Sequence, residues 1–291
     1  MRSTPQKSYI MLISSLIIFG TIGIFRRYIP LSSGLIAFFR GLIGALSLFL
    51  ITLLLKKEKW QRIGAKKFIG LVITGAFIGV NWILLFEAFN YTTIAKATLC
   101  YYLQPTIVLL VSPFLLKEKL TLKKILCAIA ALIGMVLVSG VLRAGTTQTG
   151  DFKGVLLALG AACLYAAVII LNKKITDVNI YQKTTIQLFF AGVVLLPYLL
   201  ATGDFKNLTF NANTVILLLI VCFVHTGFAY ALYFGSMTML KAQTISLFSY
   251  IDPIVAMIIS ALILKEGITW EGIIGAVLII GSAIVSEYER K

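Results

Sequence analysis

The sequence predicts an all-α membrane protein with ten transmembrane helices, arranged as two inverted repeats of five helices each. Hydrophobic residues make up 59% of the 291 residues and charged residues only 13%, and the mean hydropathy is +0.98. A soluble domain of this length does not need so much apolar surface. Apolar stretches long enough to cross about 30 Å of hydrocarbon recur along the whole chain. One segment of thirty residues also occurs twice.

The duplicated segment defines the two halves. Residues 99–128 and 247–276 align without a gap, and ten of the thirty positions are identical. The matches include a Tyr-x-x-Pro pattern and a Lys-Glu-x-x-Thr pattern, which chance matches between apolar residues do not produce. We therefore predict a tandem duplication, with one repeat at residues 1–145 and the second at residues 146–291.

The predicted spans follow in chain order. The first span carries a basic N-terminal flank like that of a signal peptide, but no small-residue cleavage site follows it, and Arg26 and Arg27 do. It is therefore predicted to stay in the protein as an uncleaved helix. The spans of the first half lie at about 8–25, 33–55, 67–89, 94–116 and 122–141. Those of the second half lie at about 154–172, 182–202, 213–236, 242–264 and 271–288.

The lysines and arginines predict the orientation. With the N-terminus inside, the inner segments hold eighteen of them and the outer segments seven, with Arg40 inside a span. Because these residues collect on the cytoplasmic side, we predict an inner (plasma) membrane protein with both termini in the cytoplasm. The net charge of +15 lies in these short loops, so no nucleic-acid partner is predicted.

An odd number of spans in each half inverts the second half relative to the first. Halves related in this way can exchange conformations around a site at the membrane midplane, which is the architecture of a carrier with alternating access. The four cysteines stand apart from one another and from the single histidine, so no metal site and no cofactor are predicted.

The two halves resemble a known family. Each half has a proline in its fourth span, then a Glu-x-Leu/Ile-Thr turn and a fifth span rich in small residues. This pattern resembles the EamA-like ten-helix branch of the drug/metabolite transporter superfamily. The resemblance implies that spans 1, 3, 4, 6, 8 and 9 line a central cavity and that spans 5 and 10 mainly pack. It also implies a cargo among amino acids, their derivatives, nucleotide precursors and drugs.

Asp252 is the strongest candidate for the site. The resembling family often has an acid before the second-half proline, and here Asp252 precedes Pro253, whereas Gln104 precedes Pro105 in the first half. A proline loosens a helix because it lacks a backbone donor and displaces the carbonyl four residues earlier. The acid beside such a break is predicted to bind a substrate amine, a coupling proton or a cation. Alternatively, it hydrogen-bonds a neighbouring helix and fixes the packing.

Three further ionisable groups lie within predicted spans, where a charge is costly. Arg40 is predicted to bind a substrate carboxylate or to pair with an acid. Glu87 lies near an outer helix end, where it reaches headgroup water or pairs with a cation. His225 is a candidate for proton coupling, and the alternative is a neutral histidine bonded between helices.

Aromatic side chains complete the predicted site, because such rings bind cationic groups. Tyr102 and Tyr250 lie three residues before the two prolines. The full set of predicted substrate-binding residues is Asp252, Gln104, Tyr102, Tyr250, Glu87, Asn81, Trp82, Tyr101, Tyr165, His225, Tyr230, Tyr233 and Arg40, with Pro105 and Pro253 as helix-loosening residues.

The sequence therefore predicts a secondary transporter of a small organic metabolite, with amino acids or related amines favoured and export favoured over import. An exporter of a drug or lipid-like solute is the main alternative, followed by an intramembrane enzyme or a scaffold subunit. No phosphate-binding loop and no hydrolase motif is present, so the chain is not predicted to be an enzyme or an ATP-driven pump. The expected partners are the lipid bilayer, the solute and a coupling proton or cation, with the protein a monomer or homodimer.

Overall fold

The computed structural model describes residues 5–54, 60–139, 141, 151–208, 210–265 and 269–288, and this part of the chain is helical and without strands. Within it, eight helices are long and apolar enough to cross a membrane, and Trp270–Ser286 forms a shorter apolar helix. The predicted all-α membrane fold is confirmed. The predicted boundary at residues 145 and 146 lies outside the described residues.

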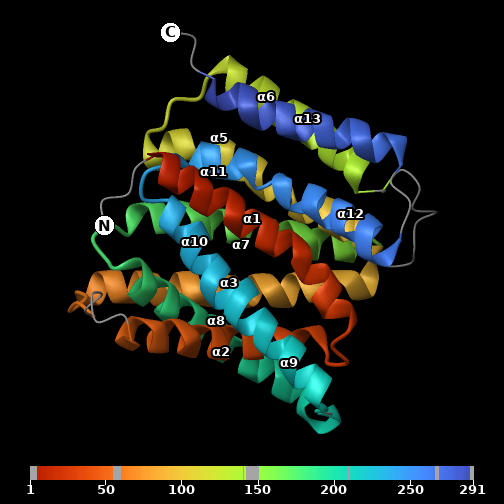
Figure 1. Ribbon diagram of the computed structural model, residues 1–291. Coiled ribbons are helices and arrows are strands. Elements are labelled where there is room, and N and C mark those ends of the chain that lie inside the picture. The colour runs from red at the N-terminus through yellow and green to blue at the C-terminus, as the bar shows by residue number, and fades with distance from the viewer. Residues whose placement is uncertain are drawn as a thin grey trace.

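The helices follow the predicted spans (Figure 1). Those of the first half are α1 (Pro5–Arg27), α2 (Ser33–Leu54), α3 (Ala65–Tyr91), α4 (Ile94–Tyr101), α5 (Gln104–Leu116) and α6 (Leu122–Val138). Those of the second half are α7 (Asp151–Lys174), α8 (Ile180–Thr202), α9 (Ala212–Ile220), α10 (Ala229–Ser236), α11 (Ala242–Phe248), α12 (Ile251–Leu264) and α13 (Trp270–Glu287). A short 3₁₀ helix, η1 (Asp204–Asn207), follows α8, and a π-helical segment, η2 (Val221–Phe228), joins α9 to α10.

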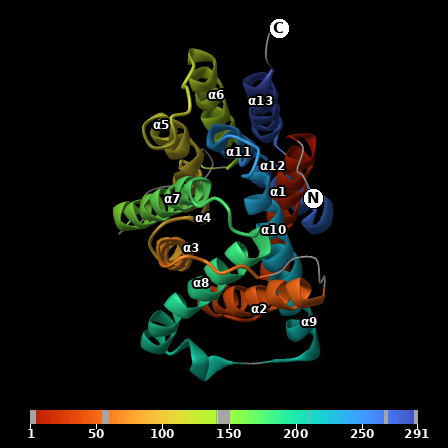
Figure 2. The ribbon, with the colours of Figure 1, turned by 90° about the vertical axis from the view of Figure 1, so that its left-hand side faces the viewer.

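Helix packing relates the two halves (Figure 2). α2 packs against α8, and α6 packs against α13. In each of these contacts, a span of the first half meets the equivalent span of the second half. The contact of α3 with α7 has its counterpart in that of α10 with α1, and the contact of α12 with α1 has its counterpart in that of α5 with α7. A two-fold rotation that maps one half onto the other would therefore map each of these contacts onto its counterpart.

Small residues allow the closest of these contacts, because they let helix backbones approach in a bilayer. A Cβ on Gly134 would lie 2.6 Å from the carbonyl oxygen of Gly275, and a Cβ on Gly275 would lie 2.5 Å from that of Gly134. Likewise, a Cβ on Gly79 would lie 2.5 Å from the carbonyl oxygen of Ala191 on α8. The α6–α13 and α3–α8 pairs therefore depend on glycine at these positions.

The repeated Lys-Glu-x-x-Thr pattern forms the turn before the last helix of each half. Lys117 and Lys265 have positive φ values of 57° and 55° and end α5 and α12. Thr121 and Thr269 are N-caps, and each side chain accepts a hydrogen bond from the first turn of α6 or α13. The duplicated motif is therefore explained by turn and cap geometry. Glu266, the second glutamate of the pattern, lies outside the described residues.

Candidate functional site

Both proline-bearing spans are broken at equivalent places. α4 ends at Tyr101 and α5 begins at Gln104, while α11 ends at Phe248 and α12 begins at Ile251. Because Pro253 has no backbone donor, the carbonyl oxygen of Ser249 accepts instead from the backbone nitrogen of Asp252, at 3.3 Å. Both spans are thus interrupted just ahead of their prolines.

The two breaks face each other. The hydroxyl of Ser246 donates to the carbonyl oxygen of Pro105 at 2.7 Å. The Tyr102 hydroxyl donates to Oδ2 of Asp252 at 2.8 Å, and the Tyr250 hydroxyl lies 3.0 Å from Oγ1 of Thr106. In each half, the tyrosine at the helix break therefore contacts a polar side chain that lies just after the break of the other half.

A cavity of about 720 Å³ lies beside these breaks. It is lined by residues of α1 to α5, α7, η2, α10 and α12, together with Ser249 at the second break. Nine of the predicted substrate-binding residues line it: Arg40, Trp82, Tyr101, Tyr102, Gln104, Tyr165, Tyr230, Tyr233 and Asp252. Among the described residues of its lining, the charged ones are Arg26, Arg40 and Asp252. The cavity can therefore hold a solute with polar groups of both charges.

Aromatic rings form a continuous wall of the cavity. Tyr101 lies 6.2 Å from Tyr165 between ring centroids, and Tyr165 stacks on Tyr233 at 6.4 Å. Phe19 contacts Tyr233 at 5.9 Å and Tyr230 at 5.2 Å, each edge-on. Packed rings of this kind resist displacement, so the wall gives an apolar body of a solute a defined surface.

Arg40 stands in the cavity lining without an acid partner. Its Nε donates to Oγ1 of Thr226 at 3.0 Å, and its guanidinium carbon lies 5.0 Å from the centroid of the Trp82 ring. Among the described residues, no carboxylate lies within 4.0 Å of its nitrogens. A guanidinium held in this way presents donors for an anionic group.

The other four predicted site residues do not line the cavity. Tyr250 is fully buried beside Thr106. Asn81 is also fully buried, and its Nδ2 donates to the carbonyl oxygen of Ala161 at 2.6 Å. His225 is buried, with Nε2 2.8 Å from the hydroxyl of Thr21. Glu87 accepts from the Tyr198 hydroxyl at 2.5 Å.

Sequence reasoning did not select four polar residues of the lining. Ser249 lies one helical turn before Asp252, and this spacing alone was a signal that the two share a face. Thr98 precedes the first break, and no sequence pattern identified it as a lining residue. Arg26 and Ser33 flank the loop between α1 and α2, where the charge was counted only for orientation.

The cavity reaches one end of the helix bundle. Arg26 at the end of α1, Ser33 at the start of α2, Phe89 near the end of α3 and Ile94 at the start of α4 all belong to its lining. We name this the open end. At the opposite end, where α3, α6 and α11 begin, no described residue of the turns belongs to the lining, and we name that the closed end.

Hydrogen bonds join the turns of the closed end. The carboxylate of Glu118 accepts from the backbone nitrogens of Ala242 and Gln243, at 2.8 and 3.2 Å, and so caps α11. Nζ of Lys124 donates to Oε1 of Gln243 at 2.6 Å. Nζ of Lys173 donates to the carbonyl oxygens of Met237 and Leu240, at 2.9 and 2.7 Å. The bonds of Glu118 and Lys124 hold the start of α11, and those of Lys173 hold the turn between α10 and α11.

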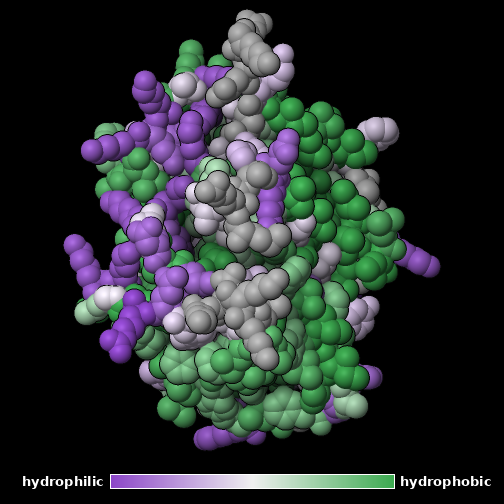
Figure 3. Space-filling model, turned by 60° about the vertical axis from the view of Figure 1, so that its left-hand side comes forward, coloured by the Kyte–Doolittle hydropathy of each residue, from purple (hydrophilic) through white to green (hydrophobic). Residues whose placement is uncertain are grey.

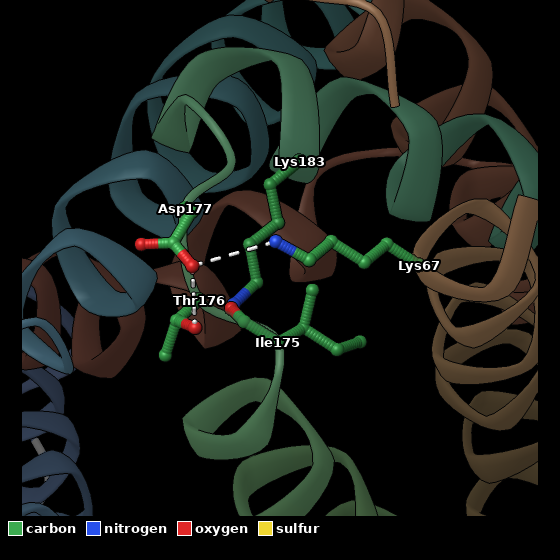
Figure 4. Close-up of polar contacts among 5 residues, drawn as sticks. All are labelled: Lys67, Ile175, Thr176, Asp177 and Lys183. Carbon is green, nitrogen blue, oxygen red and sulfur yellow. Dashed lines mark hydrogen bonds and ion pairs between the residues drawn. The ribbon is translucent and has the colours of Figure 1, made fainter. Parts of the chain in front are cut away.

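The closed end also carries an exposed ion pair and a buried lysine. Lys67 pairs with Asp177 at 3.4 Å, and Lys183 donates to the carbonyl oxygen of Ile175 at 3.0 Å (Figure 4). The Lys67–Asp177 pair is exposed, so it contributes little to stability.

Figure 3 shows the hydrophilic side chains gathered along one side of the molecule, next to a broad hydrophobic surface. Such a surface fits a helix bundle surrounded by lipid.

Comparison with known proteins gives consistent results. The model of the EamA-like transporter family matches the chain twice, over residues 6–140 and 152–288. The uncharacterized transporter YxxF of Bacillus subtilis (strain 168) is 30% identical over 262 residues, which cover 88% of this chain and 82% of that protein. Protein PecM of Dickeya dadantii (strain 3937) is 27% identical over 219 residues, or 74% of this chain and 72% of PecM. One crystal structure shares the fold, with a TM-score of 0.84, 17% identity and 98% coverage of both chains.

Proposed function

We propose, from the premise that this chain belongs to the EamA-like transporter family, that it is a secondary carrier of amino acids or related amines. Membership of the family makes the protein a membrane transporter. The observation that carries the choice of cargo is the cavity of about 720 Å³, in which Asp252 and Arg40 stand among aromatic rings. A carboxylate and aromatic faces both attract an ammonium group, and a guanidinium attracts a carboxylate.

The arrangement of the two ends supports alternating access. The cavity reaches the open end, while hydrogen bonds from Glu118, Lys124 and Lys173 hold the closed end together. The inverted repeats give each half an equivalent broken helix, so exchange of their conformations would open the other end. Opening the closed end requires Glu118 to release the start of α11.

The direction of transport and the orientation belong to the same proposal. The basic segments favour a closed end in the cytoplasm of a plasma (inner) membrane and an open end outside. Export is the favoured direction, and a proton or cation is the proposed coupling partner. A cysteine placed at Gln61, an exposed residue ahead of α3, should react with a membrane-impermeant reagent only after the membrane is opened. Labelling from outside intact cells would reverse the orientation.

Counterflow in proteoliposomes tests the cargo. Vesicles containing only this protein would be loaded in turn with unlabelled amino acids, amines, nucleosides and drug-like cations, and each would be challenged with its labelled form. The proposal expects accelerated uptake for at least one amino acid or amine. Flux of nucleosides or drug-like cations alone would be consistent with a transporter but would contradict the proposed amino-acid or amine cargo. Vesicles prepared with the Asp252→Asn variant provide the control for leakage.

A further inference from the structure

Arg40 has donors that the protein itself does not use. Its Nε bonds to Thr226, and neither terminal nitrogen donates to another residue in the described part of the chain. The side chain lines the cavity, and Trp82 lies against its guanidinium. Two parallel N–H groups on a guanidinium match the two oxygens of a carboxylate. The free edge of Arg40 therefore fits an anionic group of the solute.

Thr226 holds Arg40 in this position from an unusual helical segment. Thr226 is fully buried on η2, and its hydroxyl donates to the carbonyl oxygen of Val221, five residues earlier, at 3.0 Å. That bond fixes the hydroxyl hydrogen, so the oxygen is left to accept from Arg40. A π-helical turn carries one extra residue, and such turns are frequent at functional sites.

The segment η2 is also pressed tightly against α2. A Cβ on Gly44 would lie 3.0 Å from the side chain of Thr226, and a Cβ on Gly227 would clash with the hydroxyl of Ser47. With both glycines at this contact, the backbones of η2 and α2 approach closely enough for the Arg40–Thr226 bond. The position of the guanidinium is therefore set by packing as well as by its hydrogen bond.

The charges of the cavity lining indicate which solutes bind favourably. Arg26 at the open end and Arg40 deeper in the cavity are positive, and Asp252 is the one negative residue among the described residues of the lining. An amine without a carboxylate would add a further positive charge to this cavity. An amino acid would place its carboxylate at Arg40 and its ammonium group at Asp252.

We propose that Thr226 is a positioning residue, which aims Arg40 at the carboxylate of the solute and so makes the carrier prefer amino acids over the corresponding amines. This inference rests on the proposed function and narrows its substrate class. It assigns a role to η2 that neither the broken helices nor the aromatic wall supplies.

A binding assay at Trp82 tests the inference without relying on flux. The chain has three tryptophans, and Trp60 and Trp270 are exposed and outside the cavity lining. In a Trp60→Phe, Trp270→Phe background, the emission of Trp82 would be titrated with alanine and ethylamine, leucine and isopentylamine, and phenylalanine and phenethylamine. The measured quantity is the ratio of apparent Kd values, amine over amino acid, within each pair.

The background protein should bind at least one amino acid about tenfold more tightly than its amine, because the amine lacks a partner for Arg40. Thr226→Val should lower this ratio about fivefold, the usual worth of one hydrogen bond. Thr226→Ser keeps the hydroxyl and should keep the ratio. If the valine variant does not fold, Thr226→Ala removes the same hydroxyl from a smaller side chain.

Thr21→Val is the matched control. It removes the other hydrogen bond to η2, that of Thr21 with His225, and neither residue lines the cavity. The control should leave the ratio unchanged. An unchanged ratio in the Thr226→Val or Thr226→Ala variant would overturn the inference, and so would equal binding of amino acids and amines by the background protein.

Counterflow in the same preparations separates this inference from the proposed function. A preference for amino acids in binding, lost in Thr226→Val but without any flux, would support the inference and contradict the carrier. Flux with a preference that Thr226→Val leaves intact would contradict the inference and leave the carrier standing.

Discussion

Two carboxylates in this protein make nearly the same bond in different surroundings. Asp252 accepts from the Tyr102 hydroxyl at 2.8 Å, and Glu87 accepts from the Tyr198 hydroxyl at 2.5 Å. Asp252 follows the break between α11 and α12 and lines the cavity, whereas Glu87 lies in the unbroken helix α3 and does not. The same pairing of an acid with a tyrosine therefore occurs once in the cavity lining and once outside it. Of the two acids, the one beside a helix break is the one that lines the cavity.

Neutralising Asp252 should have the largest effect. Asp252→Asn keeps the shape of the side chain and removes the charge that holds the solute or a coupling cation. Transport should fall by more than about tenfold, equivalent to about 1.4 kcal/mol or more, while the yield of folded protein is unchanged. Asp252→Glu should keep part of the activity because only the reach of the carboxylate changes. Initial rates of counterflow would measure both variants, and near-normal transport by the asparagine variant would remove Asp252 from the mechanism.

Removing the break should have the next largest effect. Pro253→Ala restores a backbone donor at the start of α12, so the carbonyl oxygen of Ser249 can bond in a regular helix. We expect transport to fall about threefold to tenfold while the thermal midpoint stays level or rises, because alanine stabilises a helix relative to proline. The measurement pairs counterflow with thermal unfolding in detergent. Full transport with a raised midpoint would mean that the break is not needed.

The two tyrosines sharpen the comparison further. Tyr102→Phe removes the donor to Asp252 and should lower transport about fivefold, the usual worth of one hydrogen bond. Tyr198→Phe removes the equivalent donor to Glu87 and should change transport by less than about twofold. Both variants lose only one oxygen atom, so each is the control for the other. Equal losses would place Glu87 and Asp252 in one functional unit.

The smallest effect is expected for Glu87 itself. Glu87→Gln keeps an acceptor oxygen for the Tyr198 hydroxyl. It replaces Oε2, which lies 3.5 Å from Nδ2 of Asn90, with an amide nitrogen, so it gives up only that long contact. Transport should stay within about twofold of the unmodified protein. A tenfold loss by this variant, with normal folding, would show that charge anywhere between these helices matters, and the comparison would fail.

The sequence was sufficient for the fold and indicated the two breaks. Apolar length predicted the helices, and the interruptions of two spans lie just before Pro105 and Pro253. Proline alone does not decide this, because Pro113 and Pro197 lie inside α5 and α8. The sequence ranked Asp252 above Glu87 but placed both among the substrate-binding residues. Which face of a helix meets the cavity depends on how that helix packs against its neighbours, and this information is not local.

Two other residues illustrate the same limit. Asn81 and Trp82 are adjacent on α3, about 100° apart around the helix, and only Trp82 lines the cavity. His225 was predicted as a candidate for proton coupling, and Tyr230 and Tyr233 on the same span were predicted as aromatic site residues. In the structure His225 lies on the π-helical segment η2 and meets Thr21, while both tyrosines lie on α10 and line the cavity. No pattern in the sequence predicted the π-helical segment.

The central claim is that the solute binds in the cavity beside the broken helices, and not near Glu87. Protection of single cysteines tests it most directly, in a protein whose four native cysteines have been replaced. Thr98→Cys lies in the cavity lining, and Asn90→Cys lies beside Glu87 at an exposed position outside it. The solute identified by counterflow should slow alkylation of Thr98→Cys several-fold and leave Asn90→Cys unchanged. Equal rates with and without solute at Thr98→Cys, or protection of Asn90→Cys alone, would contradict the account.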